Sequence, residues 1–341
     1  MTRYIVVDPL FEDVWPLVAD HLRRHSEEDG PVELVRLAEP RERPLGSAIE
    51  EHSAATQLVS LGVEVTPACL DRFDNLEEAF VMTDSMYAVD EERKRQLEER
   101  GVTVHDHTNE GFWSESVAEF GIALTINGLR QLPQKYKAMI ESHGPWDLDQ
   151  LHNEVPGARG HQFADDPTFV NGTVAGKRVR VAGVGNIGSR YASAADFLGA
   201  DVAAYDPYAD EPCFHRTGAR RVHDLEELVH DADVFAPTVP LTDATKGLIT
   251  ADHVNALPEG ALLVLITRAG VCDMDAVRER VLADEIALAA DVWDEEPLSL
   301  SDPLLDRHNV VHTPHIAGRT ADANHRWAEH LLAHFTPISR P

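Results

Sequence analysis

Three glycines in one short stretch constrain the fold of this chain more than any other feature. The stretch VAGVGNIGSR places Gly183, Gly185 and Gly188 in GxGxxG spacing, after an apolar strand pattern and at the start of a helix pattern. In such a unit the first glycine permits a tight turn, the second lets the backbone approach a pyrophosphate, and the third lets helix and strand pack closely. The free N–H groups of the helix N-terminus would then face the phosphates. The alternative is a purely structural glycine turn.

The next predicted strand supports a dinucleotide site. It ends at Asp206, at the distance from the glycines where a carboxylate holds the ribose diol of an adenosine. A carboxylate there repels a 2′-phosphate, and no arginine follows, because the next residues are Pro207 and Tyr208. The sequence therefore favours NAD over NADP, although Asp206 could instead be a surface residue.

Strand and helix patterns alternate along most of the chain, which predicts an α/β protein with parallel sheets. From residue 176 to 293 the alternation is regular, as in a doubly wound sheet. Before it we expect a strand over 3–9, a helix over 12–25 with Pro16 in its first turn, and a long helix over 114–139 bent at Pro133.

Length, charge and cysteine content narrow the class of protein. The chain has 341 residues, which suits two domains, and a formal net charge of −29, which repels nucleic acid and anionic membranes. We see no membrane span and no signal peptide. The three cysteines lie far apart in the sequence: Cys69, Cys213 and Cys272. We therefore expect neither a disulfide framework nor a metal site. Together these features predict a cytoplasmic location.

Titratable residues follow the later strands of the regular region. Arg268 comes after one strand, Asp291 and Glu296 after the next, and His315 after the last. Side chains just past the carboxyl ends of parallel strands face the ligand crevice. Arginine would bind a carboxylate as a fork, histidine would pass a proton to or from an oxygen, and glutamate would orient the imidazole. This set suits hydride transfer at a carbonyl next to a carboxylate.

With these residues in view, the chain resembles the D-isomer-specific 2-hydroxyacid dehydrogenase family, strongly from about residue 114 to 330. The segments that carry the resemblance occur in the family's order: SVAEFGIALTINGLRQLP, VAGVGNIG, YDP, VPLTDATKGLIT, TRAGVCDMDAV, ADVWDEEPL and NVVHTPHIAG. It implies an NAD-dependent enzyme that interconverts a small 2-oxo acid, such as glyoxylate or hydroxypyruvate, and a D-2-hydroxy acid. It also implies a homodimer, for which the small-residue helix 116–130 would suit the interface.

The resemblance implies two domains and assigns roles to single residues. Residues 121–309 would form a Rossmann-type NAD-binding domain, and residues 1–120, rejoined by 310–341, a smaller flavodoxin-like substrate domain. Arg268, Glu296 and His315 would be catalytic, and Ser85, Met86 and Tyr87 would bind substrate with Arg268. Besides the three glycines and Asp206, the following residues would lie along the cofactor, with Asp291 at the nicotinamide amide: Asn186, Ile187, Pro207, Thr238, Pro240, Thr245, Thr267, Asp291 and Gly318.

Two departures from the family pattern stand near Arg268. Leu265 replaces an asparagine and Ala269 a glycine, so we expect the turn around Arg268 to differ.

Three alternatives stay open. His312 and His315 could form part of a metal site. The chain could be a formate- or phosphite-type dehydrogenase, although formate enzymes pair the histidine with glutamine rather than with a residue like Glu296. It could also be a non-catalytic NAD-sensing scaffold.

Overall fold

The structure, a computed structural model, describes residues 2–82, 91–106, 111–146, 165–166 and 168–338. The chain forms two compact units, one of residues 1–113 with 319–341 and one of residues 114–318. These limits differ from the predicted 1–120, 310–341 and 121–309. The helix that begins at Ser114 packs on the second unit's sheet, and Val310–His312 is a strand of that same sheet, so both segments belong to the second unit.

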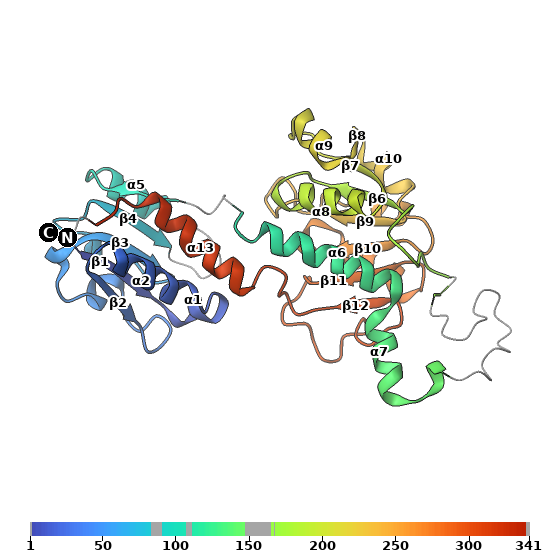
Figure 1. Ribbon diagram of the computed structural model, residues 1–341, viewed down its shortest axis with the longest axis horizontal. Helices are drawn as coiled ribbons and strands as arrows, with labels where there is room; N and C mark the ends of the chain where they lie inside the picture. The colour runs from blue at the N-terminus through green and yellow to red at the C-terminus, as the bar shows by residue number, and fades with distance from the viewer. Residues whose placement is uncertain (1, 83–90, 107–110, 147–164, 167, 339–341) are drawn as a thin grey trace. The chain divides into compact units, whose positions relative to one another are not determined.

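The first unit is built on a five-stranded parallel sheet in the order β2-β1-β3-β4-β5 (Figure 1). This order confirms the flavodoxin-like prediction. The strands are β1 (Thr2–Val7), β2 (Val32–Arg36), β3 (Ala55–Leu61), β4 (Glu78–Met82) and β5 (Thr103–Val104). The helices are α1 (Pro9–Val14), α2 (Val18–Asp29), α3 (Leu45–Ala48), η1 (His52–Ala54), α4 (Pro67–Leu70), α5 (Glu91–Glu98) and α13 (Ala321–His334).

Alternating residues of β1 divide the first unit's core into two layers. Ile5 and Val7 face the layer formed with α1, α2 and α13, where Trp327 is buried. Tyr4 and Val6 face the opposite layer, formed with α3, α4 and α5. Because successive side chains of a strand point to opposite faces, an uninterrupted apolar strand indicates a sheet covered on both sides.

Two predicted helices are each divided in the structure. The expected helix 12–25 is two helices, and Pro16 lies between α1 and α2 rather than in a first turn, since proline lacks the N–H that a continuous helix needs. The expected helix 114–139 is α6 (Ser114–Arg130) followed by α7 (Leu132–Glu141). The break lies at Gln131, whose φ of 49° is left-handed, and Pro133 stands in the first turn of α7.

The second unit contains a seven-stranded parallel sheet in the order β12-β11-β10-β9-β6-β7-β8. This is the Rossmann order extended by β12, which confirms the predicted fold class. Its strands are β6 (Arg178–Ala182), β7 (Asp201–Tyr205), β8 (Arg220–Val222), β9 (Val234–Pro237), β10 (Leu262–Leu265), β11 (Ala287–Ala290) and β12 (Val310–His312). The remaining helices are η2 (Gly144–Trp146), α8 (Asn186–Phe197), α9 (Glu211–Thr217), α10 (Leu225–His230), α11 (Ala251–Ala256), η4 (Ala269–Val271) and α12 (Met274–Leu282).

The small residues of α6 pack inside the second unit. A Cβ on Gly121 would lie 2.6 Å from Ile266 Cδ1, and one on Gly128 would lie 2.8 Å from the Leu262 side chain. These glycines therefore let the helix approach β10 and its end, and they do not form a free face. For its other residues, the expectation that helix 116–130 suits a dimer interface stays a prediction.

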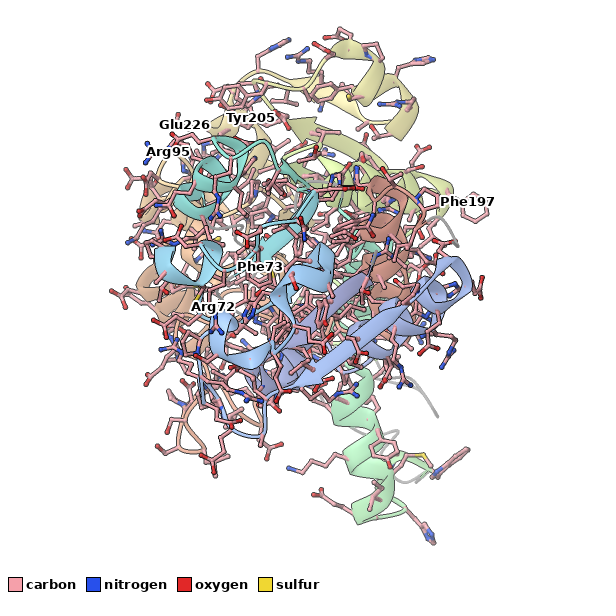
Figure 2. The ribbon with its side chains drawn as sticks, turned by 90° about the vertical axis from the view of Figure 1, so that its left-hand side faces the viewer. Arg72, Phe73, Arg95, Phe197, Tyr205 and Glu226 are labelled. Carbon is pink, nitrogen blue, oxygen red and sulfur yellow. The ribbon has the colours of Figure 1, made fainter. Side chains whose placement is uncertain are left out.

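The surface of the second unit includes an exposed aromatic side chain. Phe197, at the end of α8, is 89% exposed, and Figure 2 shows its ring pointing away from the protein. Single exposed apolar side chains of this kind are ordinary on protein surfaces. No helix in the described part of the chain has both the length and the apolar character needed to cross a bilayer.

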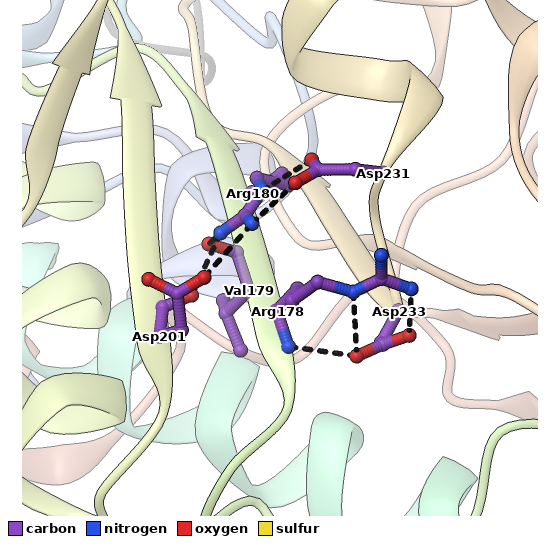
Figure 3. A network of polar contacts seen from close by, with 6 residues as sticks. All are labelled: Arg178, Val179, Arg180, Asp201, Asp231 and Asp233. Carbon is purple, nitrogen blue, oxygen red and sulfur yellow. Dashed lines mark hydrogen bonds and ion pairs between the residues drawn. The ribbon is translucent and has the colours of Figure 1, made fainter.

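Two arginines of β6 anchor the centre of the second sheet (Figure 3). Arg180 is 1% exposed; its Nε and Nη2 donate to the two Asp231 oxygens at 2.7 and 2.8 Å, and its Nη1 and Nη2 donate to Asp201. Arg178 pairs with Asp233 in the same way at the start of the strand. A buried guanidinium is stable only when its donors are satisfied, so these aspartates fix β6 against its neighbours.

Replacing Asp231 by Asn should lower the free energy of unfolding at neutral pH by about 2 kcal/mol, because the buried Arg180 loses its bidentate carboxylate. The Arg180 hydrogen bonds hold the pKa of Asp231 below its ordinary value. The carboxylate's contribution is therefore complete at neutral pH and is lost as the pH falls through that lowered pKa.

Denaturant unfolding at several pH values tests this expectation. The wild-type and Asp231→Asn stabilities should converge in acid, and Asp243→Asn, at an exposed loop residue, should change little. A constant difference down to the acid limit would contradict the assigned role.

Candidate active site

The glycine turn after β6 has the geometry that its sequence predicts. Gly183 has a φ of 98°, a left-handed conformation that favours glycine. A Cβ on Gly188 would lie 2.1 Å from Gly183 O and 2.3 Å from Thr238 Oγ1, so helix α8 can approach the strand only because this residue is glycine. Gly185 is the N-cap of α8, and a Cβ there would meet nothing within 4 Å. The turn is tight at its base and open at its tip.

Asp206 follows β7 and braces this turn. One carboxylate oxygen accepts a hydrogen bond from Val184 N at 2.8 Å, and the other accepts from Tyr208 N and Ala209 N at 2.9 and 3.0 Å. A carboxylate offers about four acceptor positions, so these three bonds leave room for a further donor. Asp206 thus joins the glycine turn to the end of β7.

Two threonines hold the strand ends beside the glycine turn. Thr238 is buried, and its hydroxyl donates to Gly183 O at 2.9 Å. Thr267 is buried as well, and its hydroxyl donates to Val239 O at 3.2 Å. Thr245 lies on the loop after β9 and donates to Pro240 O. The described hydroxyl contacts of these three residues are therefore to the chain itself, and they set the shape of this edge of the sheet.

Arg268 lies just after β10, at the start of η4, with extended backbone and a partly buried side chain. Its Nη1 donates to Thr267 O at 2.8 Å. The two departures beside it belong to the core: Leu265 is 1% exposed at the end of β10, and Ala269 is 2% exposed. Both side chains therefore pack in the core, and Arg268 lies at the strand end beside them.

A fully buried carboxylate, Asp291, organises the segment that carries His315. One oxygen accepts from Thr313 Oγ1 at 2.6 Å and from Ile316 N at 3.0 Å, and the other accepts from Ala317 N at 2.8 Å. Its described partners all lie in residues 313–317. The resemblance implies that Asp291 contacts the nicotinamide amide, and this stays a prediction; within the chain its carboxylate binds the loop groups described above.

His315 and Glu296 form a hydrogen-bonded pair. Glu296 Oε2 lies 2.7 Å from His315 Nδ1, and Glu296 Oε1 accepts from Trp293 N at 2.9 Å. Because a carboxylate only accepts, Nδ1 carries the proton and Nε2 is left for another partner. His315 has a φ of 54°, a strained conformation for a residue with a side chain. Such strain persists where surrounding contacts impose it, as the Asp291 bonds to the next two amides do.

The remaining predicted residues fall into three groups. Asn186 and Ile187 open α8, Pro207 is exposed after β7, and Gly318 ends the second unit. His312 is exposed at the end of β12, with its ring 6.4 Å from that of Trp293. The predicted substrate residues lie outside the described residues: Ser85, Met86 and Tyr87.

Two further residues that shape the site have no signal in the sequence, Trp293 and Ser116. Trp293 supplies its amide to Glu296 and its indole N–H to Thr313 O at 3.2 Å. Ser116 of α6 donates to Ala317 O at 2.6 Å. No sequence motif predicts these contacts, because each of them joins segments that are adjacent only in the folded unit.

The residues at this edge fit a bound dinucleotide. The N-terminus of the twelve-residue helix α8 presents unpaired amides, and the space above Gly185 is open to a phosphate. Asp206 retains acceptor capacity at the end of the adjacent strand. These are the donors, the space and the acceptor that a pyrophosphate and an adenosine ribose require.

Comparison with known proteins also indicates a dinucleotide-binding domain. Residues 146–317 match the model of the D-isomer specific 2-hydroxyacid dehydrogenase NAD binding domain. The chain is 28% identical over 324 residues to D-3-phosphoglycerate dehydrogenase of Methanocaldococcus jannaschii, covering 95% of this chain and 55% of that protein. It is 28% identical over 235 residues to hydroxypyruvate reductase of Thermotoga maritima, covering 68% of each.

This chain matches only part of the phosphoglycerate dehydrogenases, and it resembles solved structures in fold. The chain spans 36%, 55% and 41% of three phosphoglycerate dehydrogenases that it matches. The apo structure of D-mandelate dehydrogenase from Rhodotorula graminis superposes with a TM-score of 0.71 at 20% identity, over 97% of this chain and 92% of that one.

Replacing Asp291 by Ala should release the His315 segment, since the amides of Ile316 and Ala317 lose their acceptor. A hydrogen bond to a charged group contributes about 1.5–3 kcal/mol, so exchange of these two amides should be about tenfold faster or more. Hydrogen exchange followed by NMR measures it. The Thr238 amide, bonded to Ala182 O, serves as the internal control and should keep its protection. Equal acceleration at Thr238 would mean general destabilisation instead.

Proposed function

Because this chain belongs to the D-isomer specific 2-hydroxyacid dehydrogenase family, we propose that it is an NAD-dependent oxidoreductase acting on a small 2-oxo acid and its D-2-hydroxy acid. The observation that carries the proposal is the 2.7 Å pair of His315 Nδ1 and Glu296 Oε2 at the carboxyl edge of the Rossmann sheet. A histidine held in this way can exchange a proton through Nε2.

The second unit would hold the cofactor and the first unit would contribute to substrate binding. The amides that open α8 would bind the pyrophosphate, Asp206 the adenosine ribose, and the edge formed by Pro240, Thr245 and Thr267 would lie along the dinucleotide. The acidic Asp206 supports NAD over NADP. When bound, NADH supplies the hydride for the keto carbon.

The protein's own residues would bind the acid and move the proton. Arg268 would take the substrate carboxylate as a fork and lie close to the keto oxygen. His315 Nε2 would give its proton to that oxygen as the carbon is reduced, and Glu296 would stabilise the charged imidazole that gives it. In the oxidative direction Nε2 would accept the proton from the hydroxyl. Asp291 would keep His315 in position through the loop amides.

Two other functions are less well supported. In a formate-type enzyme, glutamine would take the place of Glu296 beside the histidine. A non-catalytic NAD-sensing scaffold would need neither the His315–Glu296 pair nor an arginine at the adjacent strand end, and this chain has both. The free thiols of Cys69, Cys213 and Cys272 support our proposal of a cytoplasmic location.

We also propose a homodimer formed through α7. This helix buries no residue within its own chain, and Figure 2 shows it in pale green with side chains spread into solvent. Leu132, Tyr136, Met139 and Ile140 are 44, 71, 50 and 68% exposed and share one helix face. An exposed helical face with four neighbouring apolar side chains is typical of a protein interface. Gln134 binds Arg307 O and Val310 O, which holds the helix in place.

The function is tested by NADH oxidation against a panel of 2-oxo acids, with NADPH in parallel. Replacing His315 by Ala should lower kcat by about 10²- to 10⁴-fold, because the proton donor is lost, while NADH binding measured by fluorescence stays close to wild type. The control is His312→Ala, at an exposed histidine three residues away, which should keep its turnover. Undiminished turnover in His315→Ala would exclude it as the acid–base residue. NADH binding without turnover of any acid would favour the scaffold.

Replacing Tyr136 by Glu should dissociate the proposed dimer, since a charge would be buried in its interface. Light scattering after size exclusion should give twice the mass of one chain for the wild type and a single chain for the variant. Tyr208→Glu is the matched control, because Tyr208 is 88% exposed and lies far along the chain from α7. A dimer that survives Tyr136→Glu would rule out this interface.

A further inference from the structure

Helices α2 and α13 of the first unit each present a pair of metal-binding side chains four residues apart. His21 and His25 lie on α2, and His325 and Glu329 lie on α13. Residues at this spacing lie on one face of a helix, one turn apart, which is a spacing that zinc-binding histidines use. None of these residues takes part in the site at the edge of the other unit's sheet.

The two helices are fixed against one another, so the cluster is held in place. Leu17 N, at the start of α2, donates to Asn324 Oδ1 on α13 at 3.1 Å. Thr320 caps α13 by accepting from Ala323 N, and Trp327 and Leu331 of α13 are buried with Leu22 of α2. The ring of His325 stacks on that of His21, with centroids 4.4 Å apart.

The ligand atoms of three residues converge. One nitrogen each from His21 and His25 and one oxygen of Glu329 lie within 4.8 Å of one another, and no other three such side chains among the described residues do so. His21 Nε2 is 3.3 Å from Glu329 Oε1. Zinc bonds of about 2.0–2.2 Å place two ligands of a tetrahedral ion roughly 3.4 Å apart. The separation of His21 Nε2 and Glu329 Oε1 therefore has the required length, and the other ligand atoms, within 4.8 Å of one another, would move together by up to about 1.4 Å on binding.

His21 is the residue that points to a ligand. It is 8% exposed, and by strict geometry neither ring nitrogen makes a hydrogen bond to a described residue; its polar neighbour is Glu329, whose Oε1 lies 3.3 Å from Nε2. Buried polar atoms are seldom left in this state.

We propose that His21, His25 and Glu329 bind a divalent transition-metal ion of the Zn²⁺ class, with water in the fourth position. Two imidazoles and a carboxylate are a donor set that zinc accepts, and imidazole favours zinc over magnesium or calcium. Glu28, with an oxygen 4.0 Å from His25 Nδ1, adds negative charge beside the ion. Because α2 and α13 come from opposite ends of the chain, the ion would cross-link the returning helix α13 to the body of its unit.

The test uses the full chain after chelator treatment, with Co²⁺ as a probe whose visible absorption reports tetrahedral nitrogen and oxygen ligands. We expect one site per chain, displacement of Co²⁺ by Zn²⁺, and a rise in Tm on adding Zn²⁺. The variants His25→Ala and Glu329→Gln are suitable because both side chains are largely exposed, 40 and 55%, so the fold should survive. Each should weaken Co²⁺ binding by about tenfold or more and abolish the rise in Tm.

His215→Ala is the matched control, because it removes an exposed histidine of α9 outside the cluster. It should bind Co²⁺ as the wild type does. The proposal is overturned if the wild type shows no tetrahedral Co²⁺ spectrum. It is equally overturned if His25→Ala and Glu329→Gln bind as tightly as the wild type, since the ion would then be held by other side chains.

Discussion

The parallel order of the seven strands is the constraint on which the candidate site depends. Every strand of the second sheet ends at the same edge, so residues that are far apart in sequence and follow different strands are brought to one place. The glycine turn follows β6, Asp206 follows β7, Arg268 follows β10, and the His315 segment follows β12. The order of the strands then determines which of these segments are neighbours. Strands β10, β11 and β12 are adjacent, and they are followed by the arginine, the two acids and the histidine, respectively.

Within this arrangement, carboxylates act mainly by holding backbone in place. Asp291 orders the segment of His315 through three hydrogen bonds, and Asp206 joins the glycine turn to the next strand. Glu296 differs, because one of its oxygens binds an amide and the other binds an imidazole. The proton transfer that we propose for His315 would need this support, since a small displacement of the imidazole would cost much of its effect.

Features that depend on neighbouring residues could be predicted from the sequence, and features that depend on contacts between distant segments could not. The glycine turn and the strands on either side of it were predicted because apolar runs and glycine spacing are local signals. The short strand β8, Arg220–Val222, was not predicted, since a polar run of three residues has no strand pattern. The sequence does not show that Gly121 and Gly128 of α6 face Ile266 and Leu262, because only the folded unit shows which neighbour a small residue accommodates.

By itself the sequence determined the two α/β units, the glycine turn with its acid, and the order of Arg268, Glu296 and His315, because these depend on local pattern and chain order. Only the tertiary structure decided that Glu296 lies 2.7 Å from His315, that Asp291 holds the loop amides, and that the histidines of α2 meet Glu329 of α13. Those contacts join side chains separated by many residues, and their distances are set by strand pairing and helix packing, which no short stretch of sequence contains.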